Sequence, residues 1–164
     1  MHPIHDVDVL LLLATALASK RRPAELAEIM AAADLLHGSI PLDVDMAAAF
    51  LRLSGQDLIA EAEGGFTLTP AALEFMAGVR HKRKAETPER RLAIRQELAG
   101  YAPKAEGVAI RLATERVSAA ILAHRTFLKG PGRNMLVPRP QPAVDKAKRP
   151  GQWRKLDSGR RSKA

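Results

Sequence analysis

Lysine and arginine side chains gather at several places along the chain, and such clusters could hold the phosphates of a nucleic acid. One cluster is Lys20-Arg21-Arg22, and another is the sequence RHKRK at residues 80–84. A third is the terminal sequence KAKRPGQWRKLDSGRRSKA, which sets the single tryptophan, Trp153, between basic side chains. The indole ring could stack on an unpaired base there while neighbouring cations hold phosphates. The ring could equally anchor this segment in a groove of a partner or of the protein itself.

We predict that nucleic acid is contacted by these clusters together with one arginine from a predicted helix. The candidate residues are Lys20, Arg21, Arg22, Arg52, Arg80, Lys82, Arg83, Lys84, Lys148, Arg149, Trp153, Arg154, Lys155, Arg160 and Arg161. For Lys20-Arg21-Arg22, ordinary solvated surface explains the same residues equally well. A basic tail can also serve solubility or bind an anionic membrane. We favour nucleic acid because neither a lipid-inserting amphipathic helix nor a lipidation motif accompanies the tail.

Residues for other kinds of chemistry are sparse. His2, His5, Asp6 and Asp8 could offer ligands to a metal, but a chain terminus followed by a helix cap explains them too. The chain has no cysteine, which excludes disulfides, zinc fingers, iron–sulfur centres and thiol catalysis. No nucleophile–base pair or nucleotide-binding motif is recognisable. We therefore predict no catalytic residues, no metal and no cofactor, and a protein that is not an enzyme.

The two halves of the chain carry opposite charge. The formal net charge is +8, but residues 1–78 hold four basic and eleven acidic side chains, and residues 79–164 hold 22 basic and seven acidic ones. The first half should repel phosphate and the second should attract it. The longest apolar run, residues 9–18, is about half of what a bilayer span needs, and acidic residues precede it. We expect a soluble, cytoplasmic protein without a membrane segment.

Helical periodicity dominates the first half of the chain. Apolar side chains at three- and four-residue spacings predict helices over about 7–19, 23–37 and 43–54, the first of them buried on most sides. Asp6 and Asp43 are suitable caps for the first and third. Leu58-Ile59 then begins a strand, Gly64-Gly65 suits a two-residue hairpin turn, and residues 66–68 alternate as the return strand.

A fourth helix is predicted from Thr69-Pro70, which reads as a cap followed by proline at the first helical position. Two amphipathic helices should follow, one starting at Thr87 and one over about 106–128. A strand over the sequence VAIRLA is the alternative within the second of these. From Lys129 onward the chain is basic and rich in proline and glycine, and it should be disordered on its own.

The order helix, helix, helix, hairpin, helix, with GQDLIAEAEGGFTLTPAALEFM at its end, resembles the winged helix-turn-helix superfamily over about residues 6–78. The resemblance implies that the third helix enters the DNA major groove and that the hairpin, called the wing, flanks it. This sequence departs from that pattern in two places. The third helix has Arg52 as its only basic side chain, and Glu61 and Glu63 precede the turn of the wing, where carboxylates would weaken phosphate binding.

The expected fold is therefore mainly α, with a winged-helix domain over 6–78, a basic hinge and helical extension over 79–128, and a disordered basic tail over 129–164. Two functions fit this sequence. One is a bacterial-type transcriptional regulator whose basic half supplies the affinity for nucleic acid, DNA more than RNA, with dimerisation through 87–128. The other is an adaptor whose acidic winged core docks on a protein partner while the tail tethers to RNA, DNA or an acidic surface.

Overall fold

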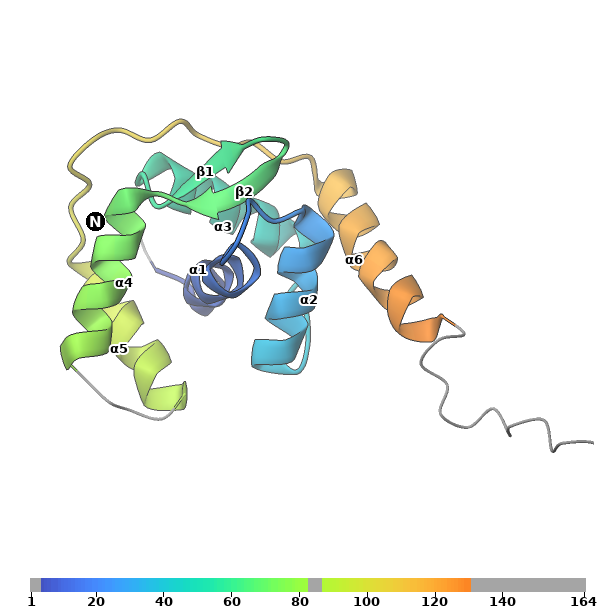
Figure 1. The fold of residues 1–164 in the computed structure, drawn as a ribbon, viewed down its shortest axis with the longest axis horizontal. Coiled ribbons are helices and arrows are strands. Elements are labelled where there is room, and N and C mark those ends of the chain that lie inside the picture. Colours follow the sequence, from blue (N-terminus) through green and yellow to red (C-terminus); the bar gives the residue numbers. More distant parts are fainter. Residues whose placement is uncertain (1–3, 83–86, 131–164) are drawn as a thin grey trace, which may run out of the picture. The chain divides into compact units, whose positions relative to one another are not determined.

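The computed structural model describes residues 4–82 and 87–130. These residues form six helices and a two-stranded antiparallel hairpin, so the prediction of a mainly α fold with a short hairpin is confirmed. The elements, drawn in Figure 1, are α1 (Asp6–Ala18), α2 (Leu26–His37), α3 (Asp43–Gly55), β1 (Ile59–Ala62), β2 (Gly65–Leu68), α4 (Pro70–Lys82), α5 (Thr87–Ala99) and α6 (Thr114–Lys129). The predicted element order is thus confirmed, including a last helix after α5.

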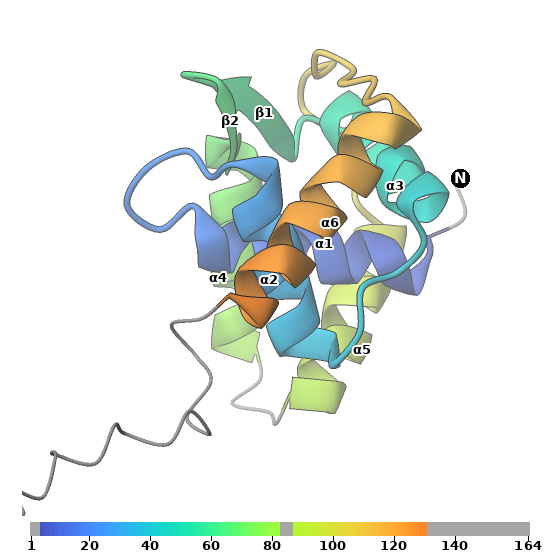
Figure 2. The same cartoon turned by 90° about the vertical axis from the view of Figure 1, so that its right-hand side faces the viewer.

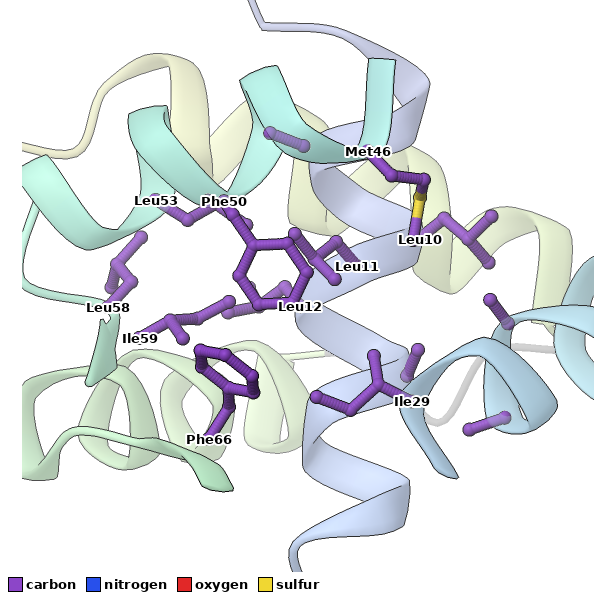
Figure 3. Packing of buried hydrophobic residues seen from close by; sticks show 14 of the residues in the cluster. Leu10, Leu11, Leu12, Ile29, Met46, Phe50, Leu53, Leu58, Ile59 and Phe66 are labelled. Carbon is purple, nitrogen blue, oxygen red and sulfur yellow. The ribbon is translucent and has the colours of Figure 1, made fainter. Parts of the chain in front are cut away.

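Helix α1 is the centre of the packing. It contacts α2, α3, α5 and β2, and five of its apolar side chains are buried: Val9, Leu10, Leu11, Leu12 and Ala14. The expected burial of this helix on most sides is confirmed. Figure 3 shows Leu11 and Leu12 of α1 beside Phe50 of α3 and Phe66 of β2, whose ring centroids lie 5.0 Å apart at 53°. Both aromatic side chains are fully buried, which at about 3–5 kcal/mol for loss of a core phenylalanine makes them major contributors to stability.

The hairpin turn is formed by Glu63-Gly64, so the prediction of a Gly64-Gly65 turn is wrong by one residue. Glu63 has φ of 50° and Gly64 of 77°, the pair of positive φ values that a tight hairpin connection requires. Gly65 is instead the first residue of β2 and pairs with Ala62. A Cβ atom on Gly65 would lie 2.8 Å from the carbonyl oxygen of Ala24, so this glycine provides space for another chain segment.

That segment is a one-residue third strand between α1 and α2. Ala24 and Phe66 exchange two backbone hydrogen bonds, both of 2.8 Å, in an antiparallel bridge. Ala24 is fully buried. The bridge fixes the start of α2 against the hairpin and was absent from the elements expected from the sequence.

The helix starts follow local sequence only in part. Thr69 caps α4 as predicted, since its Oγ1 accepts a 3.1 Å hydrogen bond from the backbone N–H of Ala72, and Pro70 is the first helical residue. The predicted caps Asp6 and Asp43 are instead the first residues of their helices, and His5 and Leu42 occupy the cap positions. The carboxylates remain in the first turn, where the helix dipole favours them.

The last two helices pack on opposite sides of the core. α5 contacts α1 and α4, whereas α6 contacts α2 and α3 and lies along them in Figure 2. The prediction of a helix starting near residue 106 is wrong, because α6 begins at Thr114. Residues 101–113 form neither helix nor strand. They run from α5 to α6, and the backbone N–H of Ile110 donates a 2.8 Å hydrogen bond to Ser54 Oγ of α3.

Candidate functional site

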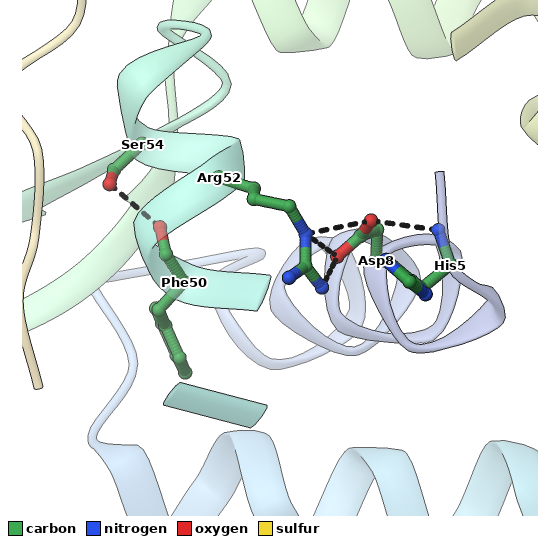
Figure 4. A network of polar contacts seen from close by, with 5 residues as sticks. All are labelled: His5, Asp8, Phe50, Arg52 and Ser54. Atoms are coloured by element: carbon green, nitrogen blue, oxygen red, sulfur yellow. Dashed lines mark hydrogen bonds and ion pairs between the residues drawn. The ribbon is translucent and has the colours of Figure 1, made fainter. Parts of the chain in front are cut away.

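Arg52, the one basic side chain of α3, is held by an aspartate of α1 (Figure 4). Its Nε and Nη2 donate hydrogen bonds of 3.0 and 2.6 Å to Asp8 Oδ1, and Nε also lies 3.1 Å from Oδ2. The Asp8 side chain is only 5% exposed, and it accepts a further 3.0 Å bond from the backbone N–H of His5. The guanidinium therefore joins α3 to α1, and its proposed contact with nucleic acid stays a prediction.

The exposed face of α3 is largely apolar. Val44 is 61% and Leu51 40% exposed, and they belong to the helical stripe of residues 44, 48, 51 and 55 together with an alanine and a glycine. Asp45 is exposed beside this stripe. Reading bases in the major groove depends on donor and acceptor side chains such as Arg, Asn and Gln, and this stripe contains none.

The hairpin presents acid at its tip. Glu61 in β1 and Glu63 in the turn are both exposed. Two surface carboxylates here favour a cationic or neutral neighbour over a phosphate backbone. The two carboxylates that depart from the pattern of a phosphate-binding hairpin therefore lie on the protein surface.

One flank of α3 is covered by α6 through polar contacts. Ser118 Oγ donates a hydrogen bond to Asp43 Oδ2 at the start of α3. His124, which is 8% exposed, pairs through Nε2 with Asp34 Oδ2 of α2 at 3.0 Å. Nearby, the guanidinium of Arg116 lies 5.9 Å from the ring centroid of Phe66. The side of the α2–α3 pair that faces α6 is therefore occupied by the chain itself.

Removal of the Ser118 hydroxyl should raise the pKa of Asp43. Hydrogen bonds from Ser118 and from the backbone N–H of Val44 lower that pKa from its ordinary value because both favour the carboxylate. The resulting stability is present above the unfolded-state pKa and is lost as pH falls through the lower folded-state value. We expect Ser118→Ala to move the Asp43 titration upward in a carboxyl ¹³C NMR experiment. An unchanged titration would show that the hydroxyl does not hold the carboxylate in solution.

The basic corner between α1 and α2 is open to solvent. Lys20, Arg21 and Arg22 are all exposed. Arg22 forms a fork with Glu28, with Nη2–Oε1 at 2.6 Å and Nη1–Oε2 at 3.2 Å, which partly neutralises it. Lys20 and Arg21 are the described candidates best placed to meet a phosphate, and their role stays a prediction.

The remaining predicted contacts are not described. Arg80 and Lys82 belong to the last turn of α4. The others lie outside the described residues, as does most of the segment predicted to be a disordered tail: Arg83, Lys84, Lys148, Arg149, Trp153, Arg154, Lys155, Arg160 and Arg161.

The compact unit, which includes α5 and α6, has equal numbers of basic and acidic side chains. Residues 1–130, which cluster as one compact unit, contain sixteen basic and sixteen acidic side chains, whereas residues 131–164 contain ten basic and two acidic ones. Basic side chains of the extension meet acids of the core, as in the pair of Arg95 Nη1 with Asp6 Oδ1 at 2.6 Å. The net charge of the chain therefore resides in residues 131–164.

Among residues 4–82 and 87–130, no three His, Asp or Glu side chains are grouped so as to hold a metal ion. Within the same ranges, none of the helices has both the length and the apolar character that a membrane span requires. Comparison with known proteins gives no match to a family model, and no curated protein or solved structure matches the chain significantly.

Proposed function

We propose that this protein is a winged-helix adaptor, in which the described unit docks on a protein partner and residues 131–164 supply affinity for nucleic acid. The observation that carries this proposal is the exposed face of α3, which is apolar while its one arginine is held by Asp8. The helix that would read DNA in a winged-helix regulator is thus suited to a protein surface.

The arrangement of the core supports the winged-helix part of the proposal. The order of elements, a three-helix core closed by a hairpin and followed by α4, is that of the superfamily that the sequence resembles. The antiparallel bridge of Ala24 to Phe66 adds the short strand between the first two helices. In this reading α3 is the recognition helix and β1–β2 is the wing.

The chemistry of the α3 face indicates the class of partner. Val44 and Leu51 offer apolar contact area, and Asp45 offers negative charge beside them. Glu61 and Glu63 add acid at the wing. Such a surface suits a protein segment that carries both apolar and basic side chains, because charge complementarity orients the partner and apolar burial supplies affinity.

Binding measurements across a salt series test the nucleic-acid part. Full-length protein and residues 1–130 are titrated into labelled DNA duplex and single-stranded RNA between 50 and 200 mM salt. Full-length protein should bind with a steep salt dependence because each neutralised phosphate releases counterions. The shorter protein, formally neutral, should lose about 100-fold or more of the affinity at low salt. Equal affinity of the two proteins would overturn the role given to residues 131–164.

A pair of matched variants tests the docking part. Leu51 on α3 and Leu73 on α4 are both exposed leucines, at 40% and 57%. We expect a protein captured by residues 1–130 to be lost with Leu51→Glu and retained with Leu73→Glu. Capture of the same proteins by all three forms would remove the α3 face from the proposal.

A transcriptional regulator is the second candidate, and the exposed Lys20 and Arg21 at the α1–α2 corner favour it. In this case residues 1–130 would themselves prefer one DNA sequence. Loss of that preference in the double variant Lys20→Ala, Arg21→Ala, with the fold intact, would establish this candidate over the adaptor.

A further inference from the structure

A cleft of about 540 Å³ lies between α1, the C-terminal end of α2 and α5, and no residue of α3 lines it. Its volume is within the range of small-molecule sites. The walls are mostly apolar, with Val9 and Leu10 from α1, Leu36 from α2 and Leu92 from α5. Leu92 is 53% exposed, so part of this apolar surface is left to solvent by the fold. The cleft thus offers burial to an apolar group.

Two arginines from one face of α5 reach this cleft, and they differ in what holds them. Arg91 donates a hydrogen bond to the carbonyl oxygen of Leu36 at the end of α2, and its Nη1 lies 3.3 Å from His37 Nδ1. An arginine side chain carries only donors, so Nδ1 is the atom that can accept in this contact. The Nε of Arg91 is buried and has no hydrogen-bond partner among the described residues. Among the described residues, Arg91 is thus contacted by a backbone carbonyl and an imidazole and is paired with no carboxylate.

Arg95, one turn further along α5, has a carboxylate partner that is easily replaced. Its Nη1 lies 2.6 Å from Asp6 Oδ1, but the two side chains are 48% and 84% exposed. Exposed ion pairs contribute little, because water solvates both charges and ordering two long side chains costs entropy. An incoming carboxylate could take the place of Asp6 and would lie close to Arg91 as well.

We propose that this cleft binds an amphiphilic monocarboxylate, with the carboxylate held by Arg95 beside Arg91 and the apolar part lying on Leu36 and Leu92. The two arginines outnumber the single acid of the lining, Asp6, which disfavours a cation. Hydrogen-bonding side chains are few, which disfavours a sugar or a nucleotide. A planar carboxylate matches the forked donors of a guanidinium.

Calorimetric titration of the full-length protein with octanoate tests this proposal. Octan-1-ol and octylammonium have the same chain with a neutral or positive end, and acetate has the carboxylate without the chain. We expect octanoate to bind, octan-1-ol to bind at least tenfold more weakly, and the other two to give no measurable heat. Equal binding of octanoate, octan-1-ol and octylammonium would overturn the proposal, as would no binding of octanoate.

Variants locate the binding. Arg95→Met should weaken octanoate binding about tenfold or more, because it removes the cation that holds the carboxylate. Leu92→Asp should abolish binding, because it places a second negative charge in the cleft. Asp6→Asn should tighten binding several-fold, since it removes the carboxylate that competes for Arg95. This gain is an effect that a general loss of structure would not produce.

Matched variants on α6 control for changes of surface charge and apolarity. Arg125 and Leu122 are also an exposed arginine and leucine, but they lie on α6, outside the cleft. Arg125→Met and Leu122→Asp should leave octanoate affinity unchanged, and circular dichroism should confirm the fold of each variant. The same loss of affinity in the α5 and α6 variants would place the binding elsewhere and overturn the assignment.

Discussion

Replacement of Arg52 by methionine is expected to destabilise the fold by about 3 kcal/mol, the lower end of the range for breaking a buried ion pair. The variant leaves the carboxylate of Asp8 in the core with only the backbone N–H of His5 as a described partner. An ionised carboxylate at 5% exposure has lost most of its hydration, which destabilises the folded state. In the variant, the guanidinium that offsets this loss is absent. Urea unfolding followed by circular dichroism measures the change.

The Arg22–Glu28 ion pair provides a control, because its N–O distance is the same but its side chains are more exposed. Its Nη2–Oε1 distance is 2.6 Å, equal to that of Arg52 Nη2 to Asp8 Oδ1, but its side chains are 61% and 42% exposed. Arg22→Met should therefore cost less than about 1 kcal/mol. In an Asp8→Asn background the cost of Arg52→Met should also fall, because no buried charge remains to be orphaned. Similar losses for Arg22→Met and Arg52→Met would contradict a burial-dependent role.

The same variant separates the two readings of Arg52. If this side chain contacted nucleic acid without bracing the core, Arg52→Met would lower the affinity and leave the stability unchanged. If it only joins α3 to α1, the folded variant should bind nucleic acid as the wild type does. Measurement of both quantities on one protein distinguishes these roles.

Features set by neighbouring residues could be predicted from the sequence, and features set by distant ones could not. Thr69-Pro70 marks the start of α4 because the cap and the proline act within one turn. The sequence predicts that Arg52 contacts nucleic acid, because nothing in its helix shows that Asp8, 44 positions earlier, accepts its hydrogen bonds. The sequence predicts the hairpin but not the position of its turn, because glycine is needed at position 65 to make room for Ala24.

The candidate sites show the same division. The acidic hairpin, with Glu61 and Glu63 exposed, follows from residues that are close together in the sequence. The cleft lined by Leu36, Arg91 and Arg95 had no sequence signal, because it is assembled from three helices that the fold brings together. The helical period of residues 106–113 is also present in the sequence, yet this segment is held in a non-helical form by contacts with α3 and the turn after it.

Those contacts centre on Gly107, and Gly107→Ala is expected to destabilise the protein by about 3 kcal/mol, the upper part of the usual range for overpacking. A Cβ atom there would lie 1.9 Å from the carbonyl oxygen of Ser54 and 2.7 Å from the backbone nitrogen of Asp57. These are backbone atoms, which cannot rotate away as a side chain would. Positive φ is not the cause, since only Gly38 and Gly64 have it among the described glycines. Glycine is needed at position 107 because there is no room for a side chain.

Gly78→Ala should have the opposite effect on the same urea unfolding curve. Gly78 lies within α4, and a Cβ atom there would have no neighbour within 4 Å. Alanine should therefore stabilise the fold by about 0.5–1 kcal/mol, because glycine is the less favourable residue inside a helix.

Neutral behaviour of Gly107→Ala would mean that residues 101–113 are not held against α3 in solution. Hydrogen exchange at the Ile110 amide, which donates to Ser54 Oγ, would then be fast in the wild type as well.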